Sequence, residues 1–237
     1  MRCALLHGFA GDPACWDDVI AAWPRREVPH SMALPGHGGG EVLDTWDANL
    51  DAIASMLVGC DVVVGYSLGA RVALGLVAAG RCAFGVLIGC NPGVADTERP
   101  ARRQFDAAWA RMLRSEGVDG FLDAWEKQPL FATQKRVPED KRARRRARRA
   151  SLDAESLARS LESMGLAAMP DYWSAIPAHR DRIALIAGAD DTKYVAIAEG
   201  LPAKSFETIP GSGHDPTLEQ PRALAAAIGR ALDKLGA

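Results

Sequence analysis

The stretch that most constrains the fold is DVVVGYSLGARVALGL, residues 61–76, where a run of valines ends in Gly-Tyr-Ser-Leu-Gly. The valines predict a buried strand, and the residues that follow are typical of a helix. Gly65 and Gly69 frame Ser67. This is the pattern of a nucleophile elbow, the sharp strand-to-helix turn that presents a serine hydroxyl above a sheet. A serine in an ordinary tight turn is the alternative.

Strand-like and helix-like segments alternate along most of the chain. Continuous apolar strands that alternate with helices predict an α/β fold with a mostly parallel sheet of about six strands. Thr45 is a candidate N-cap for one of the helices. We expect strands at 2–6, within 28–40, at 61–65, 83–90, 182–190 and 204–209, and helices at 15–23, 45–58, 68–80, near 194–201 and at 217–236.

A long insert interrupts this alternation. Strand signals vanish between about 94 and 178, where the sequence is rich in Arg, Ala, Glu and Leu and predicts several amphipathic helices. We expect 94–178 to be a helical cap over the carboxyl edge of the sheet, and 1–93 with 179–237 to form the core. The basic tract 141–149 predicts a solvated face of a cap helix, with an anion-attracting rim as the functional alternative.

Composition excludes several classes of protein. The chain has 237 residues and a net charge of −2, so no global basicity favours nucleic acid. No apolar run approaches the roughly 18 residues of a membrane span, and the N-terminus lacks the apolar core of a secretory signal. The five cysteines form no CxxC pair, which favours reduced thiols in the cytoplasm. No metal-binding or dinucleotide motif occurs, and we expect no cofactor.

A serine hydroxyl needs a histidine to activate it and an acid to orient that histidine. His214 lies after the last predicted strand, where the triad histidine should sit, whereas His179 is expected on the surface. The acid should follow the penultimate strand, and Asp190 and Asp191 both qualify by position. Spacing alone does not choose between them.

Further candidates lie on loops at the same edge of the sheet. The backbone N–H groups of Phe9 and Leu68 are the expected oxyanion donors, because Phe9 follows the first strand and Leu68 follows the serine. His7 and His37 are interpreted as loop-shaping residues that line the site, with a proton-transfer role as the alternative. Tyr66, beside the serine, is a further candidate for contact with the substrate.

The order of these motifs resembles the α/β-hydrolase superfamily, and further stretches resemble one branch of it. That branch is 2-succinyl-6-hydroxy-2,4-cyclohexadiene-1-carboxylate synthase of menaquinone biosynthesis. The resemblance runs over nearly the whole chain. It rests on LHGFAGD, LPGHG, GYSLGARVAL, the cap segment RRQFDAAWARMLRSEGVDGFLDAWEKQPLF, GADDTKY and GHDPTLEQP.

The resemblance implies residue roles and a reaction. It selects Asp191 as the acid, since this aspartate lies two residues before the lysine of GADDTKY. It implies that Arg71 contacts the substrate, with a solvated helix residue as the alternative. It also implies that Arg103 and Trp125 of the cap face the site, with core packing or a surface ion pair as the alternative for these two. The implied reaction eliminates pyruvate from a small polycarboxylate, with Ser67 as the base.

Departures from the family pattern keep other functions open. The two opening strands common in the superfamily are expected to be absent, and Thr217 stands where relatives often carry histidine. A serine hydrolase of small esters or thioesters, with Ser67 as nucleophile, is the alternative. A binding protein on a hydrolase fold is a third hypothesis, which the complete Ser67, Asp191 and His214 set disfavours. Monomer and homo-oligomer both remain open.

Overall fold

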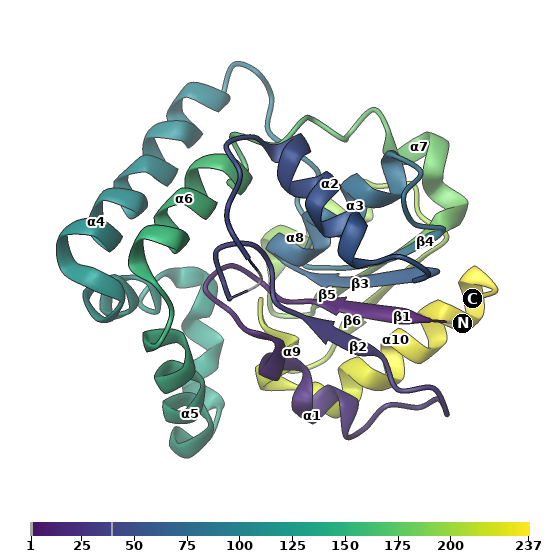
Figure 1. Cartoon of the computed structure of the whole chain (residues 1–237). Coiled ribbons are helices and arrows are strands. Elements are labelled where there is room, and N and C mark those ends of the chain that lie inside the picture. Colours follow the sequence, from purple (N-terminus) through teal and green to yellow (C-terminus); the bar gives the residue numbers. More distant parts are fainter. Residues whose placement is uncertain (1, 39) are drawn as a thin grey trace.

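Six parallel strands form one sheet in the order β2-β1-β3-β4-β5-β6 (Figure 1). The computed structural model describes residues 2–38 and 40–237, so Met1 and Gly39 of the glycine-rich loop lie outside it. The predicted α/β fold with about six parallel strands is confirmed. The strands are β1 (Cys3–Leu6), β2 (His30–Met32), β3 (Val62–Tyr66), β4 (Phe84–Ile88), β5 (Ile183–Gly188) and β6 (Ser205–Ile209).

Helices cover both faces of the sheet. One face packs against α2 (Trp46–Met56), α3 (Leu68–Ala78), α7 (Ile176–His179) and α8 (Thr192–Glu199). The other face packs against α1 (Asp17–Ile20), the preceding 3₁₀ helix η1 (Pro13–Trp16) and α10 (Pro221–Leu235). The strands β3 and β5 are buried along their whole length, because both faces are covered.

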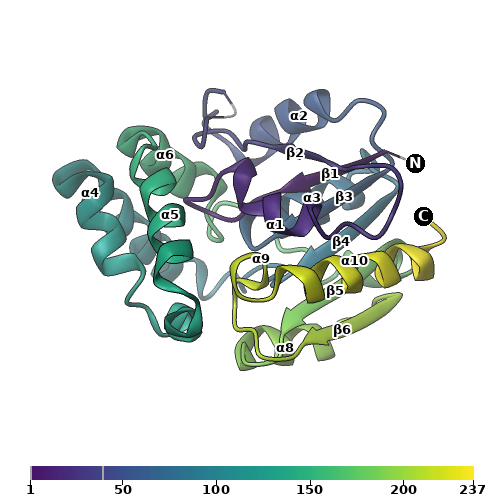
Figure 2. The same cartoon turned by 90° about the horizontal axis from the view of Figure 1, so that it is seen from below.

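A helical layer lies beside the carboxyl edge of the sheet (Figures 1 and 2). The layer consists of α4 (Arg99–Trp125), the 3₁₀ helix η2 (Pro129–Arg136), α5 (Glu139–Ala150) and α6 (Ala154–Met164). Its own core, formed mainly by α4 and α6, includes Leu113, Phe121 and Leu157. We call this layer the cap. Both ends of the chain lie at the opposite edge of the sheet (Figure 1).

The chain between the cap and β5 returns to the core. Leu166, Met169 and Ile176 are buried in the same cluster as α2 and α3, and the N–H of Tyr172 donates to the carbonyl of Pro92. The helices of the cap therefore end at Met164, earlier than the expected boundary at 178. A short 3₁₀ helix η3 (Arg180–Arg182) leads into β5. None of the described helices is both long enough and apolar enough to span a bilayer.

Two predicted helices differ from the structure. The helix expected at 15–23 is only η1 and the single turn α1, followed by a turn at 21–22. The helix expected at 217–236 is broken into α9 (Pro216–Glu219) and α10. The break falls at Gln220, which has φ −142° and ψ 56°. A residue before a proline is driven out of the helical region, and Pro221 follows. Thr45 does cap α2, since its hydroxyl accepts from the N–H of Ala48.

Candidate active site

The turn between β3 and α3 holds Ser67 in a strained conformation. Ser67 has φ +53° and ψ −106°, a region that side chains other than glycine rarely adopt. A Cβ atom added to Gly65 would lie 2.1 Å from the carbonyl oxygen of Gly69, and one added to Gly69 would lie 2.3 Å from that of Leu6. Only glycine allows strand and helix to approach this closely, so the two glycines make the turn possible.

Three side chains from separate loops meet in a hydrogen-bonded row. His214 Nε2 lies 3.1 Å from Ser67 Oγ, and His214 Nδ1 lies 2.7 Å from Asp191 Oδ2. Asp191 follows β5 and His214 follows β6, so parallel strands bring both to the same edge of the sheet. With Nδ1–H donating to Asp191, Nε2 is free to accept the hydroxyl proton of Ser67. The row can therefore move a proton from serine to histidine.

The two neighbouring aspartates have different partners. Asp190 is exposed and forms an ion pair with Arg136 of η2, whereas the side chain of Asp191 is 5% exposed and contacts His214. The structure thus places Asp191, which the family pattern selected, beside the histidine.

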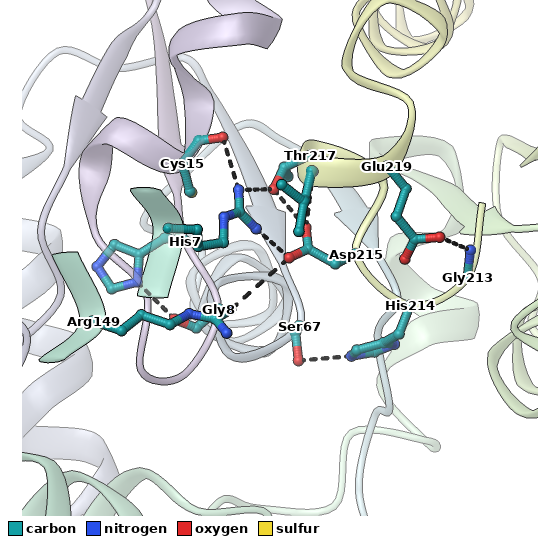
Figure 3. A network of polar contacts seen from close by, with 12 residues as sticks. His7, Gly8, Cys15, Ser67, Arg149, Gly213, His214, Asp215, Thr217 and Glu219 are labelled. Atoms are coloured by element: carbon teal, nitrogen blue, oxygen red, sulfur yellow. Dashed lines mark hydrogen bonds and ion pairs between the residues drawn. The ribbon is translucent and has the colours of Figure 1, made fainter. Parts of the chain in front are cut away.

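The loop that carries His214 is fixed on one side by Glu219 of α9. Its carboxylate accepts from the N–H of Gly213 at 2.7 Å (Figure 3). It also accepts from the hydroxyl of Thr133 at 3.1 Å. A Cβ atom on Gly213 would lie 2.2 Å from Thr133 Oγ1. Burial raises the pKa of Glu219. Because Thr133 belongs to η2, this contact also links the loop to the cap.

A cavity of about 450 Å³ opens beside Ser67 and is lined by both core and cap. Phe9 and Leu68 line it, and Leu68 is the first residue of α3, where the N–H has no acceptor within the helix. Several aromatic side chains close the side of the cavity that the cap forms. Trp125 lies 5.5 Å from Phe9 and 6.1 Å from Phe131, measured between ring centres.

Three arginines line this cavity. Arg71 of α3 has no carboxylate partner among the described residues and donates only to the carbonyl of Met164 and, weakly, to Met169 Sδ. Burial, together with repulsion from Arg102, lowers the pKa of Arg71 to about 10, so it remains a cation at neutral pH. Arg102 pairs with Asp106, and Arg149 reaches the cavity from α5. A partly buried cation without a carboxylate partner is costly unless an anion joins it, so the cavity fits an anionic ligand.

A model of the alpha/beta hydrolase family matches residues 4–227. The chain belongs to this family. The expected superfamily is confirmed, and the motifs that predicted it lie at the carboxyl edge of the sheet.

Two of the similar curated proteins share one name. The chain is 34% identical to the 2-succinyl-6-hydroxy-2,4-cyclohexadiene-1-carboxylate synthase of Enterobacter sp. (strain 638), covering 96% of this chain and 90% of the relative. It is 33% identical to the synthase of Klebsiella pneumoniae, with coverage of 96% and 92%. The solved structure of MenH from S. aureus superposes with a TM-score of 0.90 at 26% identity, covering 100% of this chain and 95% of that one. A thermophilic esterase from Thermogutta terrifontis, solved with malate bound, gives 0.83 at 25% identity, with coverage of 100% and 91%.

The structure places some predicted substrate-binding residues elsewhere. Tyr66, Arg71 and Trp125 line the cavity, but Arg103 is exposed on the outer side of α4, away from it. One residue on a helix is a rotation of about 100°, so Arg102 faces inward in its place. The cap motif alone did not show whether Arg102 or Arg103 faces the cavity. The Arg102–Asp106 spacing of four residues was the available signal.

His7 and His37 shape a loop and do not line the cavity. His7 is fully buried, with Nε2 accepting from the N–H of Leu34 and Nδ1 2.7 Å from the carbonyl of Gly8. His37 accepts from the N–H of Ala10 in the same way. The predicted loop-shaping role fits these contacts, whereas direct substrate contact by His7 does not. His179 is half-buried at the end of α7.

The basic tract 141–149 is neither a plain solvated face nor a free anion-attracting rim. Arg145 and Arg149 are buried, which the sequence analysis did not predict. They lie four residues apart and so share one face of α5. Every basic residue of the tract has an acidic partner: Lys141 with Asp18, Arg142 with Glu139, Arg144 with Asp140, Arg145 with Asp215, Arg146 with Asp123 and Glu126, Arg148 with Asp12, and Arg149 with Glu126.

Sequence reasoning also missed Tyr194 of α8. Its ring lies 4.4 Å from that of His214, and burial raises its pKa to about 12. Among the residues that the structure describes, no group of three or more His, Cys, Asp or Glu side chains could hold a metal ion.

Proposed function

We propose that this chain eliminates pyruvate from a succinyl-cyclohexene polycarboxylate, forming the product that its relatives are named for. The observation that carries the proposal is the arrangement of Arg71, Arg102 and Arg149 around one cavity that also holds Ser67. A cavity for neutral esters has little need of three guanidinium groups. The substrate is thus a small anion. The free thiols of the five cysteines fit the cytoplasm.

The number of carboxylates on the proposed substrate matches the number of arginines that line the cavity. The named product carries a succinyl carboxylate and a ring carboxylate, and pyruvate carries a third. Guanidinium groups bind carboxylates through two parallel hydrogen bonds. Arg71 is free of carboxylate partners among the described residues, so it retains donors for a ligand, and Arg149 lines the same cavity.

Ser67 acts as the base in the proposed mechanism. Its oxygen removes the acidic ring proton of the substrate while its own proton passes to His214 Nε2, 3.1 Å away. The electron pair left on carbon is shared with the succinyl carbonyl as an enolate, and it then forms the new ring double bond and breaks the bond to the leaving oxygen. Pyruvate departs as its enolate, which takes the proton from the imidazolium. The serine hydroxyl and neutral histidine are thereby restored.

The surrounding groups stabilise the charges that develop. The N–H groups of Phe9 and Leu68 are proposed to donate to the oxyanion of the enolate intermediate. Asp191 holds the imidazole in the required tautomer and balances its transient positive charge. Trp125 and its aromatic neighbours restrict the access of water to the intermediate.

A serine hydrolase is the second candidate, because the same row of side chains serves an acyl-transfer reaction. The likeness to the esterase from Thermogutta terrifontis supports it. In that case Ser67 forms a covalent acyl intermediate and the arginines select an anionic ester.

The test is release of pyruvate from the precursor, generated in situ by the preceding synthase and followed with a coupled dehydrogenase. Wild type and Ser67→Ala are compared because the precursor loses pyruvate spontaneously. Release far above background that is lost in the variant supports the proposal. Background release by both proteins contradicts it, and the hydrolase then leads.

A further inference from the structure

We propose that the buried ion pair between Arg145 of the cap and Asp215 of the histidine loop positions His214 for reaction. Asp215 directly follows His214 in the chain, and Arg145 reaches it from α5. Both are positioning residues, since neither lines the cavity beside Ser67. The inference depends on the proposed function only for the substrate used in its first test.

The pair is buried. The side chain of Arg145 is 8% exposed and that of Asp215 is 0% exposed. The guanidinium also donates to the hydroxyl of Thr217 at 2.9 Å and to the carbonyl of Cys15 at 3.4 Å. Figure 3 shows Cys15, Thr217 and Asp215 close to one another. Three segments far apart in the sequence therefore meet at one arginine: η1, the cap helix α5 and the histidine loop.

Both oxygens of Asp215 are occupied. Oδ1 accepts from the hydroxyl of Thr217 at 2.6 Å and from the N–H of Leu218 at 3.3 Å, while Oδ2 faces Arg145. Arg145 keeps the pKa of Asp215 low despite its burial. A carboxylate held at both oxygens fixes its own backbone, and the backbone of Asp215 carries the neighbouring imidazole. Displacing the arginine would free this side of the loop.

The pair also affects a cavity arginine. Arg149, one turn after Arg145 on α5, lies 4.0 Å from the same oxygen of Asp215 and lines the cavity (Figure 3). Without Arg145, the carboxylate of Asp215 would draw Arg149 toward itself and away from a substrate anion. By neutralising Asp215, Arg145 leaves the donors of Arg149 available. The pair thus couples the position of the cap to both the histidine and the anion site.

A double-variant comparison separates positioning from stability. Asp215→Asn leaves a buried unpaired guanidinium, whereas Arg145→Met combined with Asp215→Asn removes both charges, a change that is often neutral for folding. We expect the double variant to unfold near the wild-type temperature, yet to show kcat for pyruvate release about 10–100-fold lower, because small displacements of a proton-transfer group cost this much. A stable double variant with wild-type kcat would overturn the inference.

The same helix offers a matched control. Arg144 and Asp140 form an ion pair on α5 whose side chains are 62% and 63% exposed. Arg144→Met with Asp140→Asn makes the same chemical change without touching the loop. We expect kcat and KM within about two-fold of wild type, because exposed pairs contribute little. An equal loss of kcat in this control would show that any charge change on α5 suffices, which contradicts the inference.

If the double variant does not fold, a milder variant tests whether the ion pair positions His214. Thr217→Val keeps the shape of the side chain but removes the hydroxyl that joins Arg145 to Asp215. We expect kcat several-fold lower and a melting temperature only a few degrees lower, because one buried hydroxyl is lost. We also expect partial recovery of kcat in Arg145→Lys relative to Arg145→Met. Wild-type kcat in Thr217→Val would contradict the inference.

A second readout is independent of the substrate. Diisopropyl fluorophosphate reports the Ser67–His214 contact, since the serine oxygen attacks phosphorus, fluoride leaves and His214 accepts the proton. If wild type releases no pyruvate but the variants lose phosphorylation rate, the inference stands and the proposed function fails. If wild type releases pyruvate and the variants keep both rates, the inference fails alone.

Discussion

The carboxyl edge of the sheet and the cap hold their functional side chains in different ways. At the edge, backbone contacts set the position of the serine. Gly65 and Gly69 let β3 and α3 approach, and the turn forces Ser67 to φ +53°. In the cap, ion pairs set the positions of the arginines. Arg145 and Arg149 are buried only because carboxylates of other segments form ion pairs with them. The geometry of the edge therefore depends on residues close together in the sequence, whereas the geometry of the cap depends on partners far apart in the sequence.

Asp191→Asn is expected to have the largest effect at the edge. An amide leaves His214 in the wrong tautomer, so kcat for elimination should fall about 10³–10⁴-fold. Asp190→Asn is the matched control, because Asp190 is exposed and pairs with Arg136. Its kcat should stay within about two-fold. Steady-state kinetics of both variants checks this, and equal losses would show that the assignment of the acid is wrong.

Gly69→Ala tests whether the backbone fit at the edge is as strict as the geometry indicates. The added methyl would lie 2.3 Å from a backbone oxygen, which cannot yield, so the free energy of unfolding should fall by at least about 3 kcal/mol. A Cβ atom on Gly80 would have no atom within 4 Å, but Gly80 has a positive φ of 68°, so Gly80→Ala should lose only about 1–2 kcal/mol. Urea unfolding measures both. Similar losses would contradict a special role of the close approach.

The buried histidines predict a pH dependence of stability. Burial lowers the pKa of His7 to about 4 and, with the neighbouring His7, that of His37 to about 3, from an ordinary value of 6.5. The unfolded chain thus binds more protons, and stability is lost as pH falls below 6.5 toward these values. At pH 5, which is 1.5 pH units below the ordinary pKa, each of the two histidines has lowered the free energy of unfolding by about 2 kcal/mol.

His37→Gln should remove part of this dependence. The variant is expected to lose about 2 kcal/mol less than wild type between pH 7 and pH 5, because a glutamine does not titrate. Urea unfolding at both pH values provides the comparison. Parallel losses in the two proteins would show that carboxylates, and not this histidine, set the slope.

Arg114→Ala is expected to have the smallest effect. Arg114 of α4 pairs with Glu155 and Glu162 of α6, but its side chain is 37% exposed. Removing it should cost at most about 1 kcal/mol, whereas Leu113→Ala, one residue away and fully buried, should cost about 2–5 kcal/mol. Thermal unfolding of the two variants measures the contrast. A larger loss for Arg114→Ala would mean that exposed charges also hold the cap together.

The same contrast explains what the sequence could predict. The elbow and the alternation of strands and helices follow from local patterns, so the sheet, Ser67 and its neighbours at the edge were predictable. His214 was predictable from its place after the last strand. The acid was not, because Asp190 and Asp191 differ only in tertiary contacts, and the family resemblance had to choose.

In the cap, local pattern was insufficient. Arg102 and Arg103 differ by one step of a helix, and only packing against α6 and the core decides which faces inward. The burial of Arg145 depends on Asp215, 70 residues away in sequence. No periodicity within 141–149 reveals that partner. Charged residues of a helix are interpreted as solvated by default, and here a distant carboxylate overrides that default.

The most direct test of the account compares two reactions of one variant, Arg71→Met. This change removes the cavity cation that has no carboxylate partner among the described residues and leaves Ser67, Asp191 and His214 in place. We predict that kcat/KM for pyruvate elimination falls about 10–100-fold, the loss expected for a charged hydrogen bond. Hydrolysis of a neutral acetate ester should stay within about three-fold. An unchanged elimination rate, or an equal fall of both reactions, would contradict the claim that the arginines make this site specific for a polycarboxylate.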